Sequence, residues 1–223
     1  MENLKLKKHH RLVIAADGSA ASGKTTGAKK ISKKYGLKFL SSGLLYRFAS
    51  YQILKYKPKN RVHFLKKSFK KLNLKKLNSI NLHSAIISEH TSIIAKEKKI
   101  RLILKSFQKK FANKFNKVCI EGRDIGTVIL PKADIKFFFK CDLNTAARRR
   151  FRELKKKNKK IKFDKVKKQL QIRNFRDVSR KNSPLLKSSD AVIVDTGKLR
   201  KIPQMIEKMS EVVEGKIKSK YGS

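Results

Sequence analysis

The chain has 223 residues, enough to bury a substantial core, and we expect a single folded unit. It carries 59 Lys and Arg against 16 Asp and Glu, a formal net charge of +43. No apolar run approaches the ~20 residues that cross a bilayer, and the run behind the basic start is too short for a signal peptide, so we expect a cytoplasmic protein without a membrane partner.

The positive charge is spread along the chain. Lysines occupy almost every polar face, as in "KKISKKYGLK" and "LKKKNKKIKFDKVKK", whereas a dedicated nucleic-acid binder more often carries a basic stripe with stacking aromatic residues. We therefore interpret the charge as composition bias. We expect no specific nucleic-acid partner, only weak and salt-sensitive binding to polyanions.

Short apolar runs alternate with stretches of helical spacing. In chain order the pattern first predicts a strand at 12–16, a helix at 25–36, a strand at 37–40, and helices at 43–56, 61–77 and 92–115. It then predicts strands at 117–122 and 134–142, a basic helical region at 144–179 with a break near 155–160, a strand at 191–197 and a last helix from Pro203. The stretch 78–92 is ambiguous and receives no assignment. Alternation of this kind indicates an α/β fold with a parallel sheet, so we expect the loops after Ala16, Leu40, Ile120 and Phe139 to converge on one cleft.

The stretch "GSAASGKTT" follows the first predicted strand and opens the first helix. Gly18, Gly23, Lys24 and Thr25 have the spacing of a P-loop, whose backbone N–H groups and following helix hold a phosphate chain. The lysine reaches the β- and γ-phosphates, and the hydroxyl of Thr25 is a candidate Mg²⁺ ligand. The expected ATP-binding residues are Gly18, Ser19, Ala20, Ala21, Ser22, Gly23, Lys24, Thr25 and Thr26.

The P-loop does not identify the phosphoryl acceptor. No plain strand ending in a magnesium-binding Asp follows, and no guanine-reading motif is present; the strand "KVCI" leads instead into "EGRDIGT".

Four motifs together resemble bacterial cytidylate kinases, of the nucleoside monophosphate kinase group. They are "GSAASGKTT", "SSGLLYR" at 41–47, "EGRDIGTVILPKADIKFF" at 121–138 and "RNFRDVSRKNSPL" at 173–185. The match is collinear over nearly the whole chain, and "GRDIGT" before a proline and an apolar strand is its most particular part. The resemblance implies a P-loop kinase with a five-stranded parallel sheet flanked by helices, MgATP as donor, and CMP or dCMP as acceptor. We expect a monomer.

The resemblance also implies roles for individual residues. Ser42, Arg47 and Arg123 match positions that hold the acceptor phosphate. Ser92, Arg101 and Asp124 match positions around the cytosine, and Arg173, Asp177 and Arg180 match positions that meet the sugar and base. Arg149 and Arg150 match the lid over ATP. The expected catalytic residues are Lys24, Arg123, Arg149, Arg150 and Arg173.

The residue types suit this chemistry. Two nucleotides joined phosphate to phosphate concentrate about six negative charges, and arginine binds phosphate oxygens in a planar, bidentate way that lysine cannot. Asp124 could accept from the amine of cytosine, or it could pair with Arg123 or a neighbouring arginine. Asp177 could read the substrate, or it could form a helical salt bridge with Arg173.

By the resemblance, the core covers about 1–56, 92–145 and 185–223, a small NMP-binding insert about 57–91, and a basic helical lid about 146–184. Ser41 stands where family members commonly carry Asp. Ala146 replaces an arginine often found at the start of the lid helix. The insert is shorter than the usual one, which forms a small sheet.

Two other functions stay open. A kinase for UMP, dTMP or shikimate would share the P-loop but needs a different acceptor pocket, and a P-loop ATPase coupled to nucleic acid would make use of the +43 charge.

Overall fold

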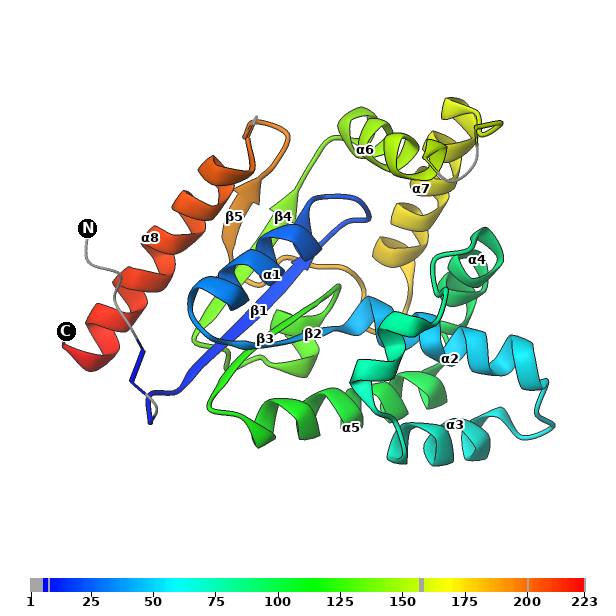
Figure 1. The fold of residues 1–223 in the computed structure, drawn as a ribbon, viewed down its shortest axis with the longest axis horizontal. Helices are drawn as coiled ribbons and strands as arrows, with labels where there is room; N and C mark the ends of the chain where they lie inside the picture. Colours follow the sequence, from blue (N-terminus) through cyan, green and yellow to red (C-terminus); the bar gives the residue numbers. More distant parts are fainter. Residues whose placement is uncertain (1–5, 8, 157–158, 200, 223) are drawn as a thin grey trace.

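The computed structural model describes residues 6–7, 9–156, 159–199 and 201–222. Its centre is a five-stranded sheet in the order β2-β3-β1-β4-β5, with all neighbouring strands parallel (Figure 1). The strands are β1 (Leu12–Gly18), β2 (Lys38–Ser41), β3 (Lys117–Gly122), β4 (Ile135–Lys140) and β5 (Val192–Asp195). The predicted α/β fold with a five-stranded parallel sheet is confirmed.

The helices lie on both faces of the sheet. They are α1 (Lys24–Lys34), α2 (Ser42–Tyr56), α3 (Arg61–Lys70), α4 (Ala85–Ile94), α5 (Lys98–Lys114), α6 (Leu143–Lys155), α7 (Phe163–Ser179) and α8 (Ile202–Tyr221), with a 3₁₀ turn η1 (Leu74–Ser79) and a π turn η2 (Ile125–Ile129). The break predicted near 155–160 separates α6 from α7.

Two helix predictions were wrong in their boundaries. The helix expected at 61–77 ends at Lys70, because the Asn73 side chain accepts from the Lys75 N–H and starts the separate turn η1. The helix expected at 92–115 is two helices, and α4 begins earlier, inside the unassigned stretch. The Ser84 hydroxyl caps α4 by accepting from the Ile87 N–H, and the chain is interrupted at 95–97 before α5.

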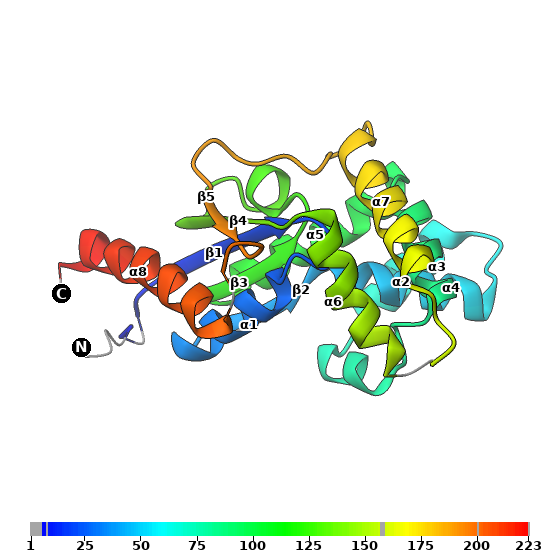
Figure 2. The same cartoon turned by 90° about the horizontal axis from the view of Figure 1, so that it is seen from above.

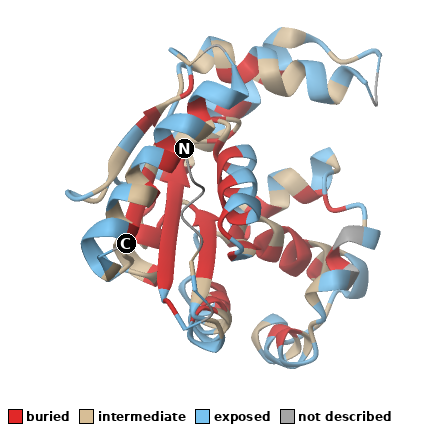
Figure 3. Ribbon diagram, turned by 60° about the vertical axis from the view of Figure 1, so that its left-hand side comes forward, coloured by how far each residue is buried: buried red, intermediate tan, exposed pale blue. Residues whose placement is uncertain are grey.

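Residues of β1 alternate between two apolar layers. Val13 and Ala15 pack into the core formed with α2, α3 and α5, whereas Leu12, Ile14 and Ala16 pack into the core formed with α1 and α8. Since successive side chains of a strand point to opposite faces, a strand covered on both sides must be apolar throughout. Figure 3 shows the strands as the buried centre of the molecule and the outer helix surfaces as exposed.

The helices α6 and α7 form a separate unit at one end of the sheet. They pack on each other through Ala146, Ala147, Val166 and Leu170, and Ala20 of the P-loop joins this cluster. Figures 1 and 2 both place α6 and α7 at the opposite end of the molecule from the chain termini. Among the described residues, no helix combines the length and apolar character needed to cross a membrane.

Two helical glycines offer a matched test of this packing. A Cβ at Gly27 in α1 would lie 2.8 Å from the Phe139 ring, whereas a Cβ at Gly215 in α8 would meet nothing within 4 Å. We predict that Gly27→Ala lowers the free energy of unfolding by about 1–3 kcal/mol through overpacking. Gly215→Ala should raise it by about 0.5–1 kcal/mol, because alanine is the better helix former. Urea unfolding measures both; equal effects would contradict the close approach of α1 to β4.

Candidate active site

A cavity of about 520 Å³ lies at the carboxyl ends of the strands, where α6 and α7 face the P-loop. The loops after β1, β2 and β3 line it, as the sheet topology predicts, and the chain after β4 contributes through residues of α6. All the residues expected to be catalytic or substrate-binding line this one cavity, together with Ala20 to Thr26.

Gly18 and Ser19, the first two residues of the expected ATP-binding stretch, do not line the cavity. Gly18 ends β1 with φ +152°, and a Cβ there would lie 2.4 Å from the carbonyl oxygen of Phe139. Glycine is therefore required for the loop to leave the sheet. The carbonyl of Ser19 accepts from the Ser22 hydroxyl at 3.0 Å, which closes the loop on itself.

Lys24 is buried and its ammonium donates to Glu121 Oε2 at 2.6 Å. The other oxygen, Glu121 Oε1, accepts from the hydroxyl of Ser41, which also caps α2 by accepting from the Leu44 N–H. Burial by itself would raise the pKa of Glu121, but the charge of Lys24 and the hydrogen bonds from Lys24 and Ser41 hold it below its usual value. The lysine and the glutamate therefore form an ionised pair in the floor of the cavity.

Sequence reasoning missed Glu121. A magnesium-binding carboxylate at the end of a strand is usually an Asp, whereas here a Glu, with one more methylene, follows "KVCI". Ser41, noted because it stands in place of an Asp, is the hydrogen-bond partner of this carboxylate.

Asp17 is a second carboxylate that the sequence did not single out. It is buried at the end of β1, where its two oxygens accept from the N–H groups of Ile125 and Gly126 at 2.8 and 2.7 Å. Burial raises its pKa to about 6, and the two backbone hydrogen bonds oppose that rise. Asp17 thereby fixes the turn η2 directly after Arg123 and Asp124.

Seven arginines of the described chain line the cavity, and four of them come from four parts of the fold: Arg47 from α2, Arg123 from the end of β3, Arg150 from α6 and Arg173 from α7. Burial, followed by the positive charges of Arg150 and Arg123, lowers the pKa of Arg47 to about 10. Burial, followed by the charge of Arg123, lowers the pKa of Arg173 to about 9. The guanidinium groups thus repel one another and stay charged at neutral pH, as an anion-binding site requires.

These arginines differ in how they are already held. Arg47 donates to the Leu82 carbonyl and the Ser88 hydroxyl at 2.9 and 2.8 Å, and Arg150 pairs with Glu153 at 2.7 Å. Arg173 makes no hydrogen bond with any residue that the structure describes, so its donors are available to a ligand.

Asp177 is buried in the cavity wall, where it accepts from Arg123 Nε at 2.8 Å and from Arg180 Nη1 at 3.4 Å. Asp177 thus pairs with Arg123 of another element and with Arg180, the residue directly after α7, and forms no close salt bridge with Arg173. Burial would raise the pKa of Asp177, but the nearby arginines hold it below its usual value. Arg180 Nη2 is buried without a hydrogen-bond partner among the described residues.

Asp124 pairs with Arg101, whose second amino group donates to the Ala95 carbonyl at 3.0 Å. The guanidinium lies over the ring of Tyr46, 5.7 Å from its centroid, and burial raises the pKa of that tyrosine to about 12. The pairing of Asp124 with a neighbouring arginine is thus present, with Arg101 rather than Arg123 as partner. Nearby, the Ser92 hydroxyl accepts from Arg176 at 2.8 Å.

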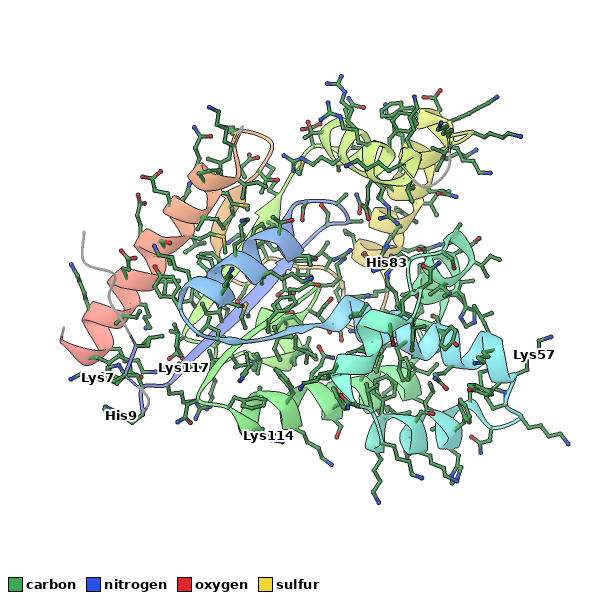
Figure 4. The ribbon with its side chains drawn as sticks, viewed as in Figure 1. Lys7, His9, Lys57, His83, Lys114 and Lys117 are labelled. Carbon is green, nitrogen blue, oxygen red and sulfur yellow. The ribbon has the colours of Figure 1, made fainter. Side chains whose placement is uncertain are left out.

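Side chains far from the cavity account for much of the positive charge. In Figure 4 the labelled Lys57 and Lys114 lie at the outer ends of α2 and α5. The labelled His83, in contrast, lies among α2, α4 and α7 and lines the cavity. No group of three or more metal-binding side chains of the His, Cys, Asp and Glu types occurs in the described part of the chain.

Comparison with known proteins adds the following. Residues 14–215 match the sequence model of the family described as cytidylate kinase. The chain is 39% identical over 192 residues to the cytidylate kinase of Bartonella tribocorum, covering 84% of this chain and 87% of that protein. It is 35% identical over 218 residues to the cytidylate kinase of Fusobacterium nucleatum, covering 91% of this chain and 97% of that protein.

A solved structure shares the fold. The shikimate kinase of Bacteroides thetaiotaomicron superposes with a TM-score of 0.50 at 14% identity, over 91% of this chain and 98% of that one. At this identity the likeness concerns the fold alone, whereas the family match covers most of the chain at the level of sequence. The chain therefore belongs to the cytidylate kinase family.

Proposed function

We propose that the chain transfers the γ-phosphoryl group of MgATP to CMP or dCMP, giving ADP and CDP or dCDP. The observation that carries the proposal is the convergence of Arg47, Arg123, Arg150 and Arg173 with the P-loop lysine in one cavity that also holds the pair Arg101–Asp124. Family membership supports the same reaction. We further propose that the chain acts as a monomer in the cytoplasm, without a specific nucleic-acid partner.

In this reaction the P-loop binds the donor triphosphate. When ATP binds, the Lys24 ammonium leaves Glu121 and contacts the β- and γ-phosphates, which carry more negative charge than the carboxylate. Arg149 and Arg150 reach the cavity from α6, where they neutralise the donor phosphates and help to exclude water.

The oxygen atoms beside the P-loop fit Mg²⁺, which prefers hard oxygen ligands and keeps several waters. The hydroxyl of Thr25 lines the cavity at the start of α1, and Ser41 and Glu121 line the same side. These three residues would hold the ion or its waters. When bound, it neutralises charge on the phosphates during transfer.

The acceptor occupies the other half of the cavity. Ser42, Arg47 and Arg123 hold its phosphate, and Arg173 bridges toward the transferred group. Asp177 and Arg180, which line the cavity, bind the sugar and base, and Asp124, Arg101 and Ser92 read the base. The acceptor phosphate is already ionised, so no general base is needed and alignment with charge neutralisation is sufficient.

The reaction is tested by ADP release over a panel of acceptors, with CMP, dCMP, UMP, dTMP and shikimate compared. Turnover with CMP and dCMP well above the rest is expected. A preference for another acceptor would overturn the proposal, and so would ADP release that single-stranded RNA stimulates and CMP does not.

Lys24→Met should lower kcat about 10³-fold, since the donor phosphates lose a preorganised charge. It should also destabilise the fold, because Glu121 is left buried and unpaired. The double variant Lys24→Met/Glu121→Gln separates these effects: its melting temperature should recover and its kcat should not. A single variant with kcat within tenfold of the parent would contradict the role of Lys24.

Asp124→Asn should reduce the ratio of kcat/KM for CMP to that for UMP by about 10- to 100-fold, the range for a hydrogen bond to a charged group. The amide keeps the shape of the side chain but no longer repels the carbonyl of uracil. Asp164→Asn, at an exposed position of α7, is the matched control and should leave the ratio unchanged. A ratio unaltered in both variants would place base selection elsewhere.

A further inference from the structure

The P-loop is held from two sides by side chains that lie outside it. On one side, the Ala20 N–H donates to Asn174 Oδ1 of α7 at 3.2 Å. On the other, the hydroxyl of Thr196, which follows β5, donates to the Ser22 carbonyl at 2.9 Å. Thr196 is buried at 4% exposure and is itself fixed, because its own N–H donates to the Lys140 carbonyl at 2.9 Å.

The residue between these two contacts is strained. Ala21 has φ +57°, in the left-handed region that costs a residue with a Cβ about 1–2 kcal/mol. Such a conformation persists only where its surroundings enforce it. Here the two external hydrogen bonds tie the Ser19–Ala20 and Ser22–Gly23 peptide groups, which bracket the short segment that contains Ala21.

The second contact also sets the direction of a backbone donor. A trans peptide unit is planar, so its carbonyl and N–H point in opposite directions. Thr196 holds the Ser22 carbonyl on the side away from the cavity, since Thr196 does not line it and Gly23 does. The Gly23 N–H of the same peptide is thereby turned toward the other side, where a phosphate oxygen can accept from it.

Both contacts lead to the helices of the lid. Asn174 belongs to α7, and Arg149 of α6 donates to Thr196 through Nη1 to the hydroxyl at 2.8 Å and through Nη2 to the carbonyl at 2.7 Å. The Thr196 hydroxyl thus accepts from the lid and donates to the P-loop. Each lid helix is linked to one side of the strained residue.

We propose that Asn174 and Thr196 are positioning residues for the donor nucleotide: they hold Ala21 in its left-handed conformation and so aim the P-loop N–H groups at the triphosphate. The proposal deepens the proposed function, since it takes ATP as the ligand of this loop. It assigns the lid helices a second task, keeping the loop in its binding conformation.

The test measures MgATP binding by calorimetry and the KM values for ATP and CMP. Asn174→Ala and Thr196→Val, the latter close in shape to threonine, should each weaken ATP binding and raise the KM for ATP about tenfold, with the KM for CMP changed less than twofold. Thr196→Ser, which keeps the hydroxyl, should bind ATP within twofold of the parent. Asn113→Ala, at an exposed site of α5, is the matched control for Asn174 and should change neither value.

Rescue distinguishes positioning from general support of the fold. Glycine adopts positive φ without strain, so Ala21→Gly should recover at least threefold of the ATP affinity lost in Thr196→Val. The proposal is overturned by ATP binding unchanged in both Asn174→Ala and Thr196→Val, by equal losses for ATP and CMP, or by no recovery with Ala21→Gly. Failure of the parent protein to phosphorylate CMP would count against the proposed function alone, because ATP binding is measured without the acceptor.

Discussion

Mutual repulsion among the arginines that share the cavity is the constraint on which this site depends. Arg47, Arg123, Arg150 and Arg173 lie in one cavity, and burial together with like charges lowers the pKa of Arg173 to about 9 and that of Arg47 to about 10. A folded protein gains nothing from such an arrangement without an anion. Two nucleotides meeting through their phosphates supply the missing negative charge, and a loose phosphoryl transition state needs that neutralisation most.

The fold limits this repulsion because it pairs several cationic side chains of the cavity with carboxylates, while some guanidinium N–H groups stay available to a ligand. Asp177 accepts from Arg123 and Arg180, Asp124 pairs with Arg101, and Glu121 pairs with Lys24. Glu121 and Asp124 lie at the end of β3 and Asp177 lies on α7, so the sheet and this helix together preorganise the charges. The carboxylates can yield their cations to phosphate, whereas Arg173 is attracted by the charge of Asp177 but forms no close ion pair with a carboxylate among the described residues.

The sequence was sufficient for features that short motifs or periodicity encode. The P-loop, the parallel sheet and the arginines of the cavity were all predicted, because each depends on local spacing or on a collinear resemblance. Contacts between distant segments were not. Asn174 lies 154 positions from Ala20, and Thr196 lies 174 positions from Ser22. The interruption of the helix at 95–97 was also missed. There the Ala95 carbonyl accepts a hydrogen bond from the side chain of Arg101, a residue that lines the cavity. Nothing in periodicity indicates such pairs.

The most direct measurement is the melting temperature of the ligand-free Arg173→Met variant, with its kcat/KM for CMP. Methionine keeps much of the apolar bulk and removes the charge. Because the folded state disfavours the charged form of Arg173, its removal should raise the melting temperature at neutral pH. The same variant should lose at least about 100-fold in kcat/KM for CMP. A lower melting temperature, or turnover close to that of the parent, would contradict the view that the cavity stores positive charge for two nucleotides.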